Sequence, residues 1–232
     1  MLPFKDNIPT ERFPLITVVL IAVNIAVFLY ELSLEAVGRL DSFFLQYGMT
    51  PHDITHAALQ DPRSLPIYLT LVTSMFLHGG WLHIGGNMLY LWIFGNNVED
   101  SMGRFRFVVF YLFCGILAGF AQIAIDASSQ VPNIGASGAI AGVLGAYLLL
   151  FPRAKVTTLV FLVVFITVVQ LPAVIVLLFW FLFQLFYGLS GLSGSSQEVA
   201  YFAHIGGFVA GLLAIKLFTL GKHMVHIKRG YM

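Results

Sequence analysis

Long apolar runs alternate with short polar segments along this chain, and the length of the runs predicts helices that cross a membrane. A helix needs roughly 20 apolar residues to cross a hydrocarbon core about 30 Å thick. We read six runs as spans, at about residues 14–32, 74–94, 107–125, 137–151, 173–189 and 201–220. The pattern therefore predicts an all-α membrane protein, with a single domain over residues 1–232 that is a bundle of six transmembrane helices.

Two segments between these runs differ from a spanning helix. Residues 33–73 are too polar to span, and their scattered Leu, Phe and Tyr predict a long loop that packs on the outer membrane surface. Residues 156–169 are apolar but rich in β-branched side chains. We read them as an interfacial segment that lies at the cytoplasmic surface of the membrane or dips into it.

The basic residues set the orientation of the bundle, because cytoplasmic loops of membrane proteins carry an excess of Lys and Arg. With both termini in the cytoplasm, only Arg39 and Arg63 lie outside. This split requires that one span, and not two, lies between Lys155 and the outer loop Ser190–Gln197. The residues that then lie on or near the cytoplasmic side are Lys5, Arg12, Arg104, Arg106, Arg153, Lys155, Lys216, Lys222, Lys228 and Arg229.

The composition agrees with a membrane protein and narrows its possible functions. Of the 232 residues, 59% are hydrophobic and only 10% are charged, whereas a soluble domain is usually about a quarter charged. The net charge of +1 gives no indication of nucleic acid as a partner. Cys114 is the single cysteine, which excludes an intrachain disulfide. No small-residue cleavage site follows the first apolar run, so we read that run as a span and not as a signal peptide.

A serine and a histidine at the starts of two predicted spans are the candidate chemistry. Ser137 stands in the small-residue stretch Gly135–Gly142, and His204 stands in the similar stretch Ala203–Gly207. The topology, which rests on Lys and Arg alone, places both side chains at similar depth near the outer surface. Small residues four positions apart let membrane helices approach closely. Ser137 and His204 could then act as nucleophile and general base, with N–H groups at the helix start holding an oxyanion.

The alternative is that both stretches are only packing faces. A helix rich in Gly, Ala and Ser is more often just that, so the serine alone carries little weight. An ionisable side chain inside a membrane is costly and usually functional, and the matched depth of His204 therefore favours chemistry. No carboxylate completes a triad, because Glu99 and Asp100 lie on the far side and the outer carboxylates lie in loops. We therefore predict a Ser137–His204 dyad.

A second polar group, around the predicted second span, consists of His78, His83 and Asn87. His83 and Asn87 are four residues apart, so they share one helical face near the outer end. Their N–H groups could help to hold an oxyanion, or they could simply be polar contacts between helices. A metal site of His78, His83 and His204 is a rival interpretation, but the chain lacks a His-Glu-x-x-His pattern and a carboxylate ligand. We predict no metal and no other cofactor.

Four segments taken together resemble the rhomboid family of intramembrane serine proteases. The resemblance runs from about Leu71 to Leu213, which is most of the chain. The segments are Gly135-Ala136-Ser137-Gly138, similar to the family's nucleophile motif; Ala203-His204-Ile205-Gly206-Gly207, similar to its general-base motif; His78, His83 and Asn87, similar to its second-helix motif; and Glu99 with Gly103-Arg104-Phe105, similar to its loop between spans two and three.

The resemblance implies a rhomboid-like bundle of six helices in which Ser137 is the nucleophile and His204 is the base. It implies a serine-type endopeptidase of the lipid bilayer that cleaves single-pass transmembrane proteins near the outer ends of their helices, without metal or ATP. It assigns the oxyanion hole to His83, Asn87 and the backbone of Ser137 and Gly138. It assigns His78 a supporting role.

The chain also departs from the family pattern. There is no Trp-Arg pair between Glu35 and Thr73, and Ala141 stands where some members have a tyrosine that stacks on the histidine, so another group has to orient His204. A catalytically silent rhomboid-like protein that binds membrane-protein clients is the alternative function. A transporter would need an inverted repeat with broken helices, which the sequence does not have. The lack of long soluble domains indicates a bacterial or archaeal plasma (inner) membrane.

Overall fold

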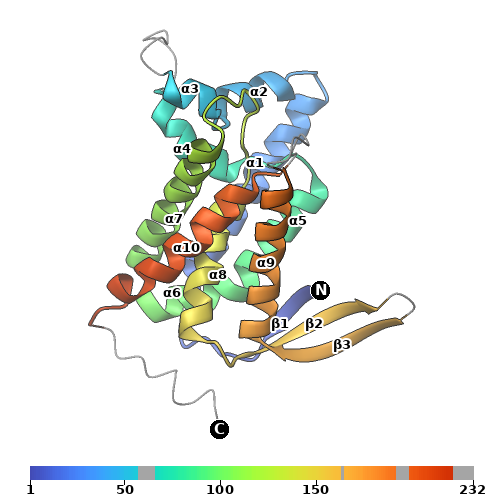
Figure 1. The fold of residues 1–232 in the computed structure, drawn as a ribbon, viewed down its shortest axis with the longest axis vertical. Helices are drawn as coiled ribbons and strands as arrows, with labels where there is room; N and C mark the ends of the chain where they lie inside the picture. The colour runs from blue at the N-terminus through green and yellow to red at the C-terminus, as the bar shows by residue number, and fades with distance from the viewer. Residues whose placement is uncertain (57–65, 163–164, 192–198, 222–232) are drawn as a thin grey trace.

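The structure is a computed structural model, and it describes residues 1–56, 66–162, 165–191 and 199–221. The helices run side by side along the long axis of the molecule, with short helices at one end and a β-sheet at the other (Figure 1). The N-terminus lies at the end that carries the sheet. Residues 222–232 lie outside the described residues, as do most of the loop Ser190–Gln197 and residues 57–65 of the predicted outer loop, so the predicted place of the C-terminus stays a prediction.

Helices form on all six apolar runs. Among the described residues, four helices are long and apolar enough to cross a membrane on their own: α1 (Leu15–Glu35), α7 (Arg104–Ile125), α9 (Ala173–Gly191) and α10 (Tyr201–Phe218). A shorter apolar helix, α8 (Ser137–Leu150), has 14 residues. Long apolar helices that carry large exposed hydrophobic side chains belong to a protein that is embedded in a membrane and crosses it several times.

The second apolar run begins its helix later than the sequence pattern indicates. Residues 74–76 form only a turn of 3₁₀-helix (η3, Ser74–Phe76), and Leu77 continues in an extended conformation. The helix begins at Trp81, directly after Gly79 and Gly80, as α5 (Trp81–Tyr90). It continues without a break through a π-helical turn, η4 (Leu91–Gly95), into α6 (Asn96–Met102). Two consecutive glycines favour a loop over a helix, which moves the helix start by seven residues.

The predicted outer loop contains short helices that lie over one end of the bundle (Figure 1). Residue 133 of the α7–α8 connection joins this layer through an isolated bridge, in which the N–H groups of Met49 and Asn133 each donate to the other residue's carbonyl, at 3.0 and 2.8 Å. The helices of this layer are α2 (Leu40–Tyr47), α3 (Pro51–Thr55), η2 (Ile67–Leu69) and α4 (Thr70–Thr73).

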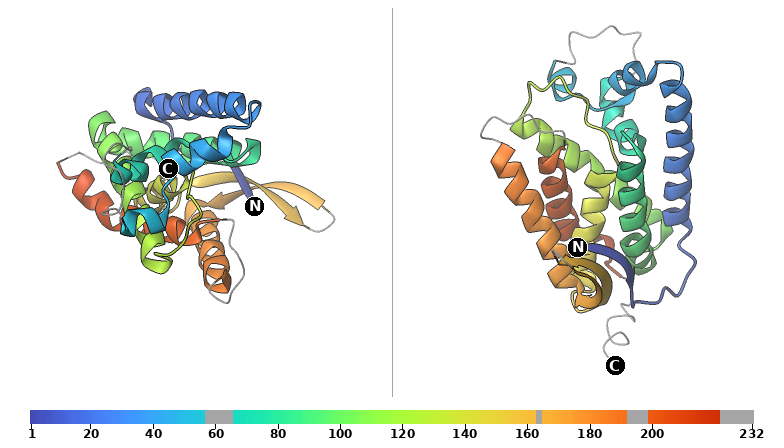
Figure 2. Two further views of the ribbon diagram at one scale, coloured as in Figure 1. Left: turned by 90° about the horizontal axis from the view of Figure 1, so that it is seen from above. Right: turned by 90° about the vertical axis from the view of Figure 1, so that its right-hand side faces the viewer.

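A three-stranded antiparallel sheet at the opposite end corrects the all-α prediction. Strands β2 (Lys155–Leu162) and β3 (Phe165–Pro172) pair antiparallel as a hairpin, and β1 (Leu2–Asp6) pairs with the other edge of β2. The β-branched residues that set this segment apart in the sequence favour strands, because they fit a pleated surface better than a helix. The hairpin projects sideways from the helices (Figure 2). Its position at the cytoplasmic interface stays a prediction.

Helix α8 is the centre of the bundle. Eleven of its 14 residues are buried, so neighbouring parts of the protein cover this short apolar helix on most sides. Its small residues let α10 approach to backbone contact, since a Cβ on Gly207 would overlap the carbonyl oxygen of Gly138, and one on Gly211 would overlap that of Gly142. The predicted close approach of these two helices is therefore confirmed.

Candidate active site

Ser137 is the first residue of α8 and follows a sharp backbone turn. Gly135 has φ of 125°, a conformation that L side chains rarely adopt, and its N–H donates to the carbonyl of Ser74 at 2.9 Å. A Cβ at Gly135 would lie 2.6 Å from Nε2 of His83 and 3.5 Å from Oγ of Ser137. The glycine therefore lets the backbone pass close to both side chains and turns Ser137 toward a cavity.

The predicted pair comes together. His204 lies in the first turn of α10, and its Nε2 is 2.7 Å from Oγ of Ser137. The two residues are 67 positions apart in the sequence, and the contact exists because α8 and α10 touch along their glycine faces. A nucleophile and its base need a separation of about 2.6–3.2 Å, so this pair has the geometry for proton transfer.

The other ring nitrogen of His204 also has a partner, and the sequence analysis did not identify it. Oε1 of Gln184 lies 2.8 Å from Nδ1 of His204. Gln184 is on α9 and is 7% exposed. The sequence signal that could have found it is a single amide in an apolar helix, between Leu182-Phe183 and Leu185-Phe186.

His83 points its Nε2 toward the serine. Its Nδ1 accepts the N–H of Gly79 at 3.3 Å, so in the neutral ring the proton is on Nε2. That nitrogen is the one that faces Gly135, next to Ser137. His83 therefore presents a hydrogen-bond donor to the space beside the serine.

Asn87 is one helical turn further along α5 and presents a second donor. Its side chain is 8% exposed, and its Nδ2 is buried without a hydrogen-bond partner among the described residues. A buried N–H group without an acceptor costs free energy, and such a group in a native site calls for a ligand or an ordered water. Asn87 can therefore donate to a group that enters the cavity.

These side chains share one cavity of about 470 Å³ between α5, α8, α9 and α10. Most of its lining is apolar and includes Leu82, Ile140, Leu144 and Trp180. A space of this size with few, convergent polar groups is typical of a substrate site. The polar residues that line it are His83, Asn87, Tyr90, Ser137, Gln184 and His204.

His78 lies behind the site and does not line this cavity. Its ring packs edge-on against His83, with 5.1 Å between ring centroids, and the side chain is only 1% exposed. Its backbone N–H donates to the buried carboxylate of Glu31 on α1, at 3.2 and 3.3 Å to the two oxygens. His78 can therefore support the ring of His83 from outside the cavity.

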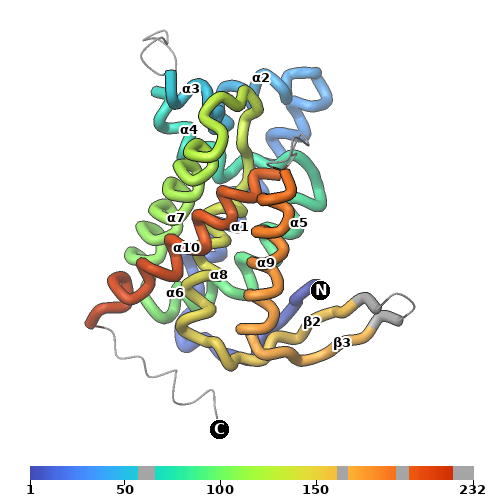
Figure 3. The backbone as a smooth tube through the Cα atoms, viewed as in Figure 1, coloured from blue at the N-terminus to red at the C-terminus, as the bar shows by residue number. Residues whose placement is uncertain are grey.

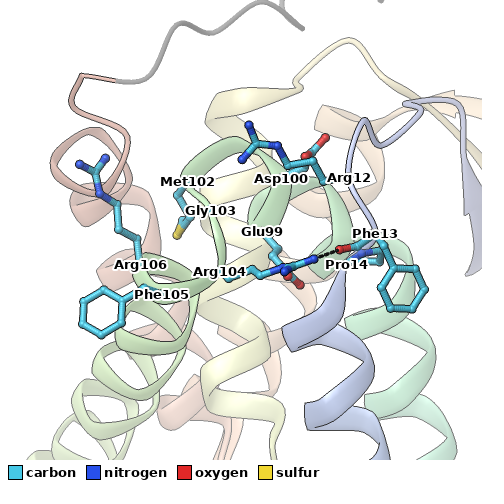
Figure 4. A pocket seen from close by; sticks show the side chains of 10 residues that line it. All are labelled: Arg12, Phe13, Pro14, Glu99, Asp100, Met102, Gly103, Arg104, Phe105 and Arg106. Carbon is cyan, nitrogen blue, oxygen red and sulfur yellow. Dashed lines mark hydrogen bonds between the residues drawn. The ribbon is translucent and has the colours of Figure 1, made fainter.

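A second cavity, of about 530 Å³, lies at the far end of the bundle (Figure 4). Two of its polar side chains, Glu99 and Arg104, join α1 to the α6–α7 turn. The carboxylate of Glu99 accepts the N–H groups of Ile16 and Thr17 at 3.0 and 2.8 Å, which caps the start of α1. Arg104 donates to the carbonyl of Phe13 at 3.4 Å. This junction holds α1 to the α6–α7 turn, and Glu99 is far from Ser137, as the sequence analysis expects.

Comparison with known proteins places the chain in a class and then in a family. The long apolar helices define an integral, multi-pass membrane protein. The rhomboid domain matches residues 67–220, about two thirds of the chain, and the chain therefore belongs to the rhomboid family. The expected family resemblance is confirmed.

Individual relatives agree with this assignment. The chain is 30% identical over 151 residues to Rhomboid protein 1, mitochondrial, from Saccharomyces cerevisiae, a match that covers 62% of this chain and 40% of the relative. It is 28% identical over 185 residues to Rhomboid-like protein 11, chloroplastic, from Arabidopsis thaliana, covering 77% of this chain and 60% of that one. It is 44% identical over 78 residues to Rhomboid protease GluP from Bacillus subtilis, covering 34% and 15%.

The names of two relatives bear on the expected location of this protein. The chain spans only 40% and 60% of the length of the mitochondrial and chloroplastic relatives that it matches. Because the names of these relatives place them in organelles, they do not support the expected bacterial or archaeal plasma membrane. This protein is an integral membrane protein that crosses a membrane several times.

Proposed function

We propose that this protein is an intramembrane serine endopeptidase that hydrolyses peptide bonds in or near transmembrane segments of other membrane proteins. Ser137 is the nucleophile and His204 is the general base. The observation that carries the proposal is the 2.7 Å separation of Oγ of Ser137 and Nε2 of His204 in a cavity large enough for a peptide segment. Membership of the rhomboid family, in which one relative is named a protease, supports it.

The first chemical step transfers a proton and forms a bond. Nε2 of His204 takes the hydroxyl proton of Ser137 as Oγ attacks the scissile carbonyl carbon, which gives a tetrahedral intermediate and an imidazolium. The imidazolium then returns this proton to the leaving amine. The products of this half of the reaction are an acyl-enzyme on Ser137 and a released peptide with a new N-terminus.

Water completes the cycle. A water molecule gives a proton to Nε2 of His204 as its oxygen attacks the ester carbonyl, and collapse of the second intermediate returns the proton to Oγ of Ser137. Water has to reach the site from a membrane surface, so the shallow position of Ser137, at the start of its helix, matters for this step.

The negative oxygen of both intermediates needs donors. We assign this oxyanion hole to Nε2–H of His83, Nδ2–H of Asn87 and the backbone N–H groups of Ser137 and Gly138. The first N–H groups of a helix have no intrahelical acceptor, and the positive end of the helix dipole points the same way. His78 supports the ring of His83 from behind.

The proposed substrates are single-pass transmembrane proteins, which reach the site from the surrounding lipid bilayer. The six apolar helical runs cross the membrane, with both termini in the cytoplasm and with α2 and α3 on the outer side. A bound segment has to unwind before its carbonyl can face Ser137, because the carbonyls of a helix are engaged in its own hydrogen bonds. Helix-breaking residues near the outer end of the segment lower the cost of unwinding.

The test uses purified protein in liposomes with a labelled single-pass substrate. Wild type is compared with Ser137→Ala, each with and without a metal chelator, and cleavage is followed on gels. Ser33→Ala is the matched control, since the Ser33 hydroxyl lies on α1 and donates to the carbonyl of Tyr30 at 2.6 Å. The proposal requires cleavage by wild type and by the control, none by Ser137→Ala, and no effect of the chelator.

A fluorophosphonate probe separates this proposal from the alternative, a silent rhomboid-like protein that only binds membrane-protein clients. The probe reacts with an activated serine whatever the substrate. Labelling of wild type that is absent in Ser137→Ala supports the protease. If wild type neither reacts with the probe nor cleaves any of a panel of single-pass substrates, the protein is a client-binding one.

A further inference from the structure

Gln184 is an amide on the inner side of an apolar helix. It is 7% exposed, and burying an amide without a partner costs free energy. The hydrogen-bond partner that the structure gives its side chain is Nδ1 of His204, 2.8 Å from Oε1. The cavity that holds Ser137 and His204 is lined by Gln184 as well. The amide of Gln184 on α9 is therefore directed at the histidine of α10 that faces Ser137.

The chemistry of the two groups decides which of them donates. The carbonyl oxygen of an amide can only accept, so Nδ1 of His204 has to carry the proton. A neutral imidazole has one ring proton, which leaves Nε2 as an acceptor, 2.7 Å from Oγ of Ser137. This is the tautomer that can take a proton from the serine. The opposite tautomer would direct an N–H at Oγ of Ser137 and could not act as a base.

Other neighbours of His204 do not select a tautomer. Trp180 and Tyr201 lie with their ring centroids 6.0 and 6.3 Å from that of the histidine. Such contacts restrict the plane of the ring but make no hydrogen bond to either nitrogen at that separation. The other titratable side chains that line the cavity are His83 and Tyr90, and within the described part of the chain neither is hydrogen-bonded to His204.

We propose that Gln184 is a positioning residue that fixes the Nδ1–H tautomer and the orientation of His204, the role that a carboxylate has in a Ser-His-Asp triad. An amide does this without a formal charge, and a charge in this buried place inside a membrane would be costly. The proposal rests on the proposed function of the Ser137–His204 pair, but the tautomer itself exists whether or not a substrate is cleaved. It can therefore be measured separately from activity.

The direct test is the protonation pattern of the His204 ring. We would record ¹⁵N NMR spectra of the purified full chain with labelled histidine in detergent micelles at neutral pH, and assign the His204 signals by their loss in His204→Asn. We expect wild type to have the proton on Nδ1, and Gln184→Leu to lose this preference. Gln184→Glu keeps an acceptor at the same place and retains it. A wild-type ring with its proton on Nε2 would overturn the inference.

The second measurement asks whether this positioning matters for reactivity. We expect the rate of fluorophosphonate labelling at Ser137 to fall on the order of ten- to a hundredfold in Gln184→Leu, because a hydrogen bond to a ring that becomes charged is lost. In Gln184→Glu the rate recovers at least in part. Ser190→Ala is the matched control, since Ser190 is a polar residue of the same helix whose hydroxyl donates to the carbonyl of Phe186 at 2.8 Å.

The outcomes distinguish this inference from the proposed function. If wild type does not react with the probe, the proposed function fails, and the NMR measurement still decides the tautomer. If Gln184→Leu reacts at the wild-type rate, or if its His204 keeps the wild-type tautomer, Gln184 is not a positioning residue. If Gln184→Leu does not fold, the wild-type tautomer and the labelling of Gln184→Glu still test the inference: the proton on Nε2, or loss of labelling in the folded Glu variant, would overturn it.

Discussion

Gly207 of α10 lies directly against the carbonyl group of Gly138 in α8, so closely that a methyl group on Gly207 would overlap that oxygen. The same contact recurs one turn further along each helix, between Gly211 and Gly142. Gly138 follows Ser137 and Gly207 lies three residues after His204, so this contact between two backbones brings Ser137 and His204 together.

Gly207→Ala is therefore expected to destabilise the protein by about 1–3 kcal/mol, because the helices have to separate to admit a methyl group. Separation also lengthens the distance between Ser137 and His204, so probe labelling should fall even at temperatures where the variant is folded. Thermal unfolding in micelles and the labelling rate check the two effects. Gly85→Ala is the control, since a Cβ there meets no atom of the described residues within 4 Å and the change also removes a helix-interior glycine. Equal stability losses in both variants would contradict the packing argument.

Loss of either member of the dyad should have the same effect as loss of both. His204→Ala removes the base and is expected to lower the labelling rate of Ser137 by about 10²–10⁴-fold. Substrate cleavage by Ser137→Ala, His204→Ala and the double variant should be equally low, because the two residues act as a unit. Cleavage rates in liposomes measure this; cleavage by the double variant far below that of both single variants would argue against a dyad.

The amide of Asn87 should act on the reaction and not on substrate binding. Asn87→Leu removes a donor that we place at the oxyanion, and we expect kcat to fall about 10²–10³-fold with little change in KM. Steady-state cleavage at several substrate concentrations separates the two constants. The control is Asn96→Ala on the same helical run, whose side chain accepts the N–H of Asn97 at 2.6 Å. A change confined to KM would place Asn87 in substrate binding instead.

The buried carboxyl group of Asp6 should make the stability of the protein depend on pH. Its carboxylate accepts hydrogen bonds from the hydroxyl of Tyr147 at 2.5 Å and from Asn97 at 2.6 Å, which holds β1 to α8 and α6. Burial nevertheless raises the pKa of Asp6 from 3.8 to about 6, since the charged form is poorly solvated there. The folded state therefore binds this proton more tightly than the unfolded chain does, and folding loses stability as pH rises from about 4 through about 6.

The measurement compares the thermal unfolding of wild type with that of Asp6→Asn at a series of pH values. Tm of wild type minus Tm of Asp6→Asn should fall between about pH 4 and pH 7 and level off above that, because the amide does not titrate. Asp41→Asn, an exposed residue of α2, controls for the loss of a negative charge. A difference that rises with pH would show that the hydrogen bonds outweigh the burial of Asp6.

Several features of this protein follow from the sequence because they depend on local pattern. Apolar runs of sufficient length indicate the helices, and small residues at the starts of two of them indicate both the close contact and the pairing of Ser137 with His204. The four-residue spacing of His83 and Asn87 indicates a shared helical face, and the resemblance to rhomboid proteases adds the expectation that both serve the oxyanion hole. The apolar pattern gives one wrong helix boundary. It starts the second helix at Ser74, whereas the structure starts it at Trp81, after the two glycines.

Other features were decided only by tertiary structure. Residues 156–162 of the predicted interfacial segment form a strand because residues 2–6, about 150 positions earlier, and residues 165–172 supply its hydrogen-bond partners. The pairing with residues 2–6 depends on a distant segment of the chain. Gln184 is a similar case. Its place in an apolar helix is visible in the sequence, but its contact with His204 depends on how α9 is rotated against α10. The sequence by itself determines which side chains are available for chemistry, while the packing of the helices decides which nitrogen of the histidine faces the serine.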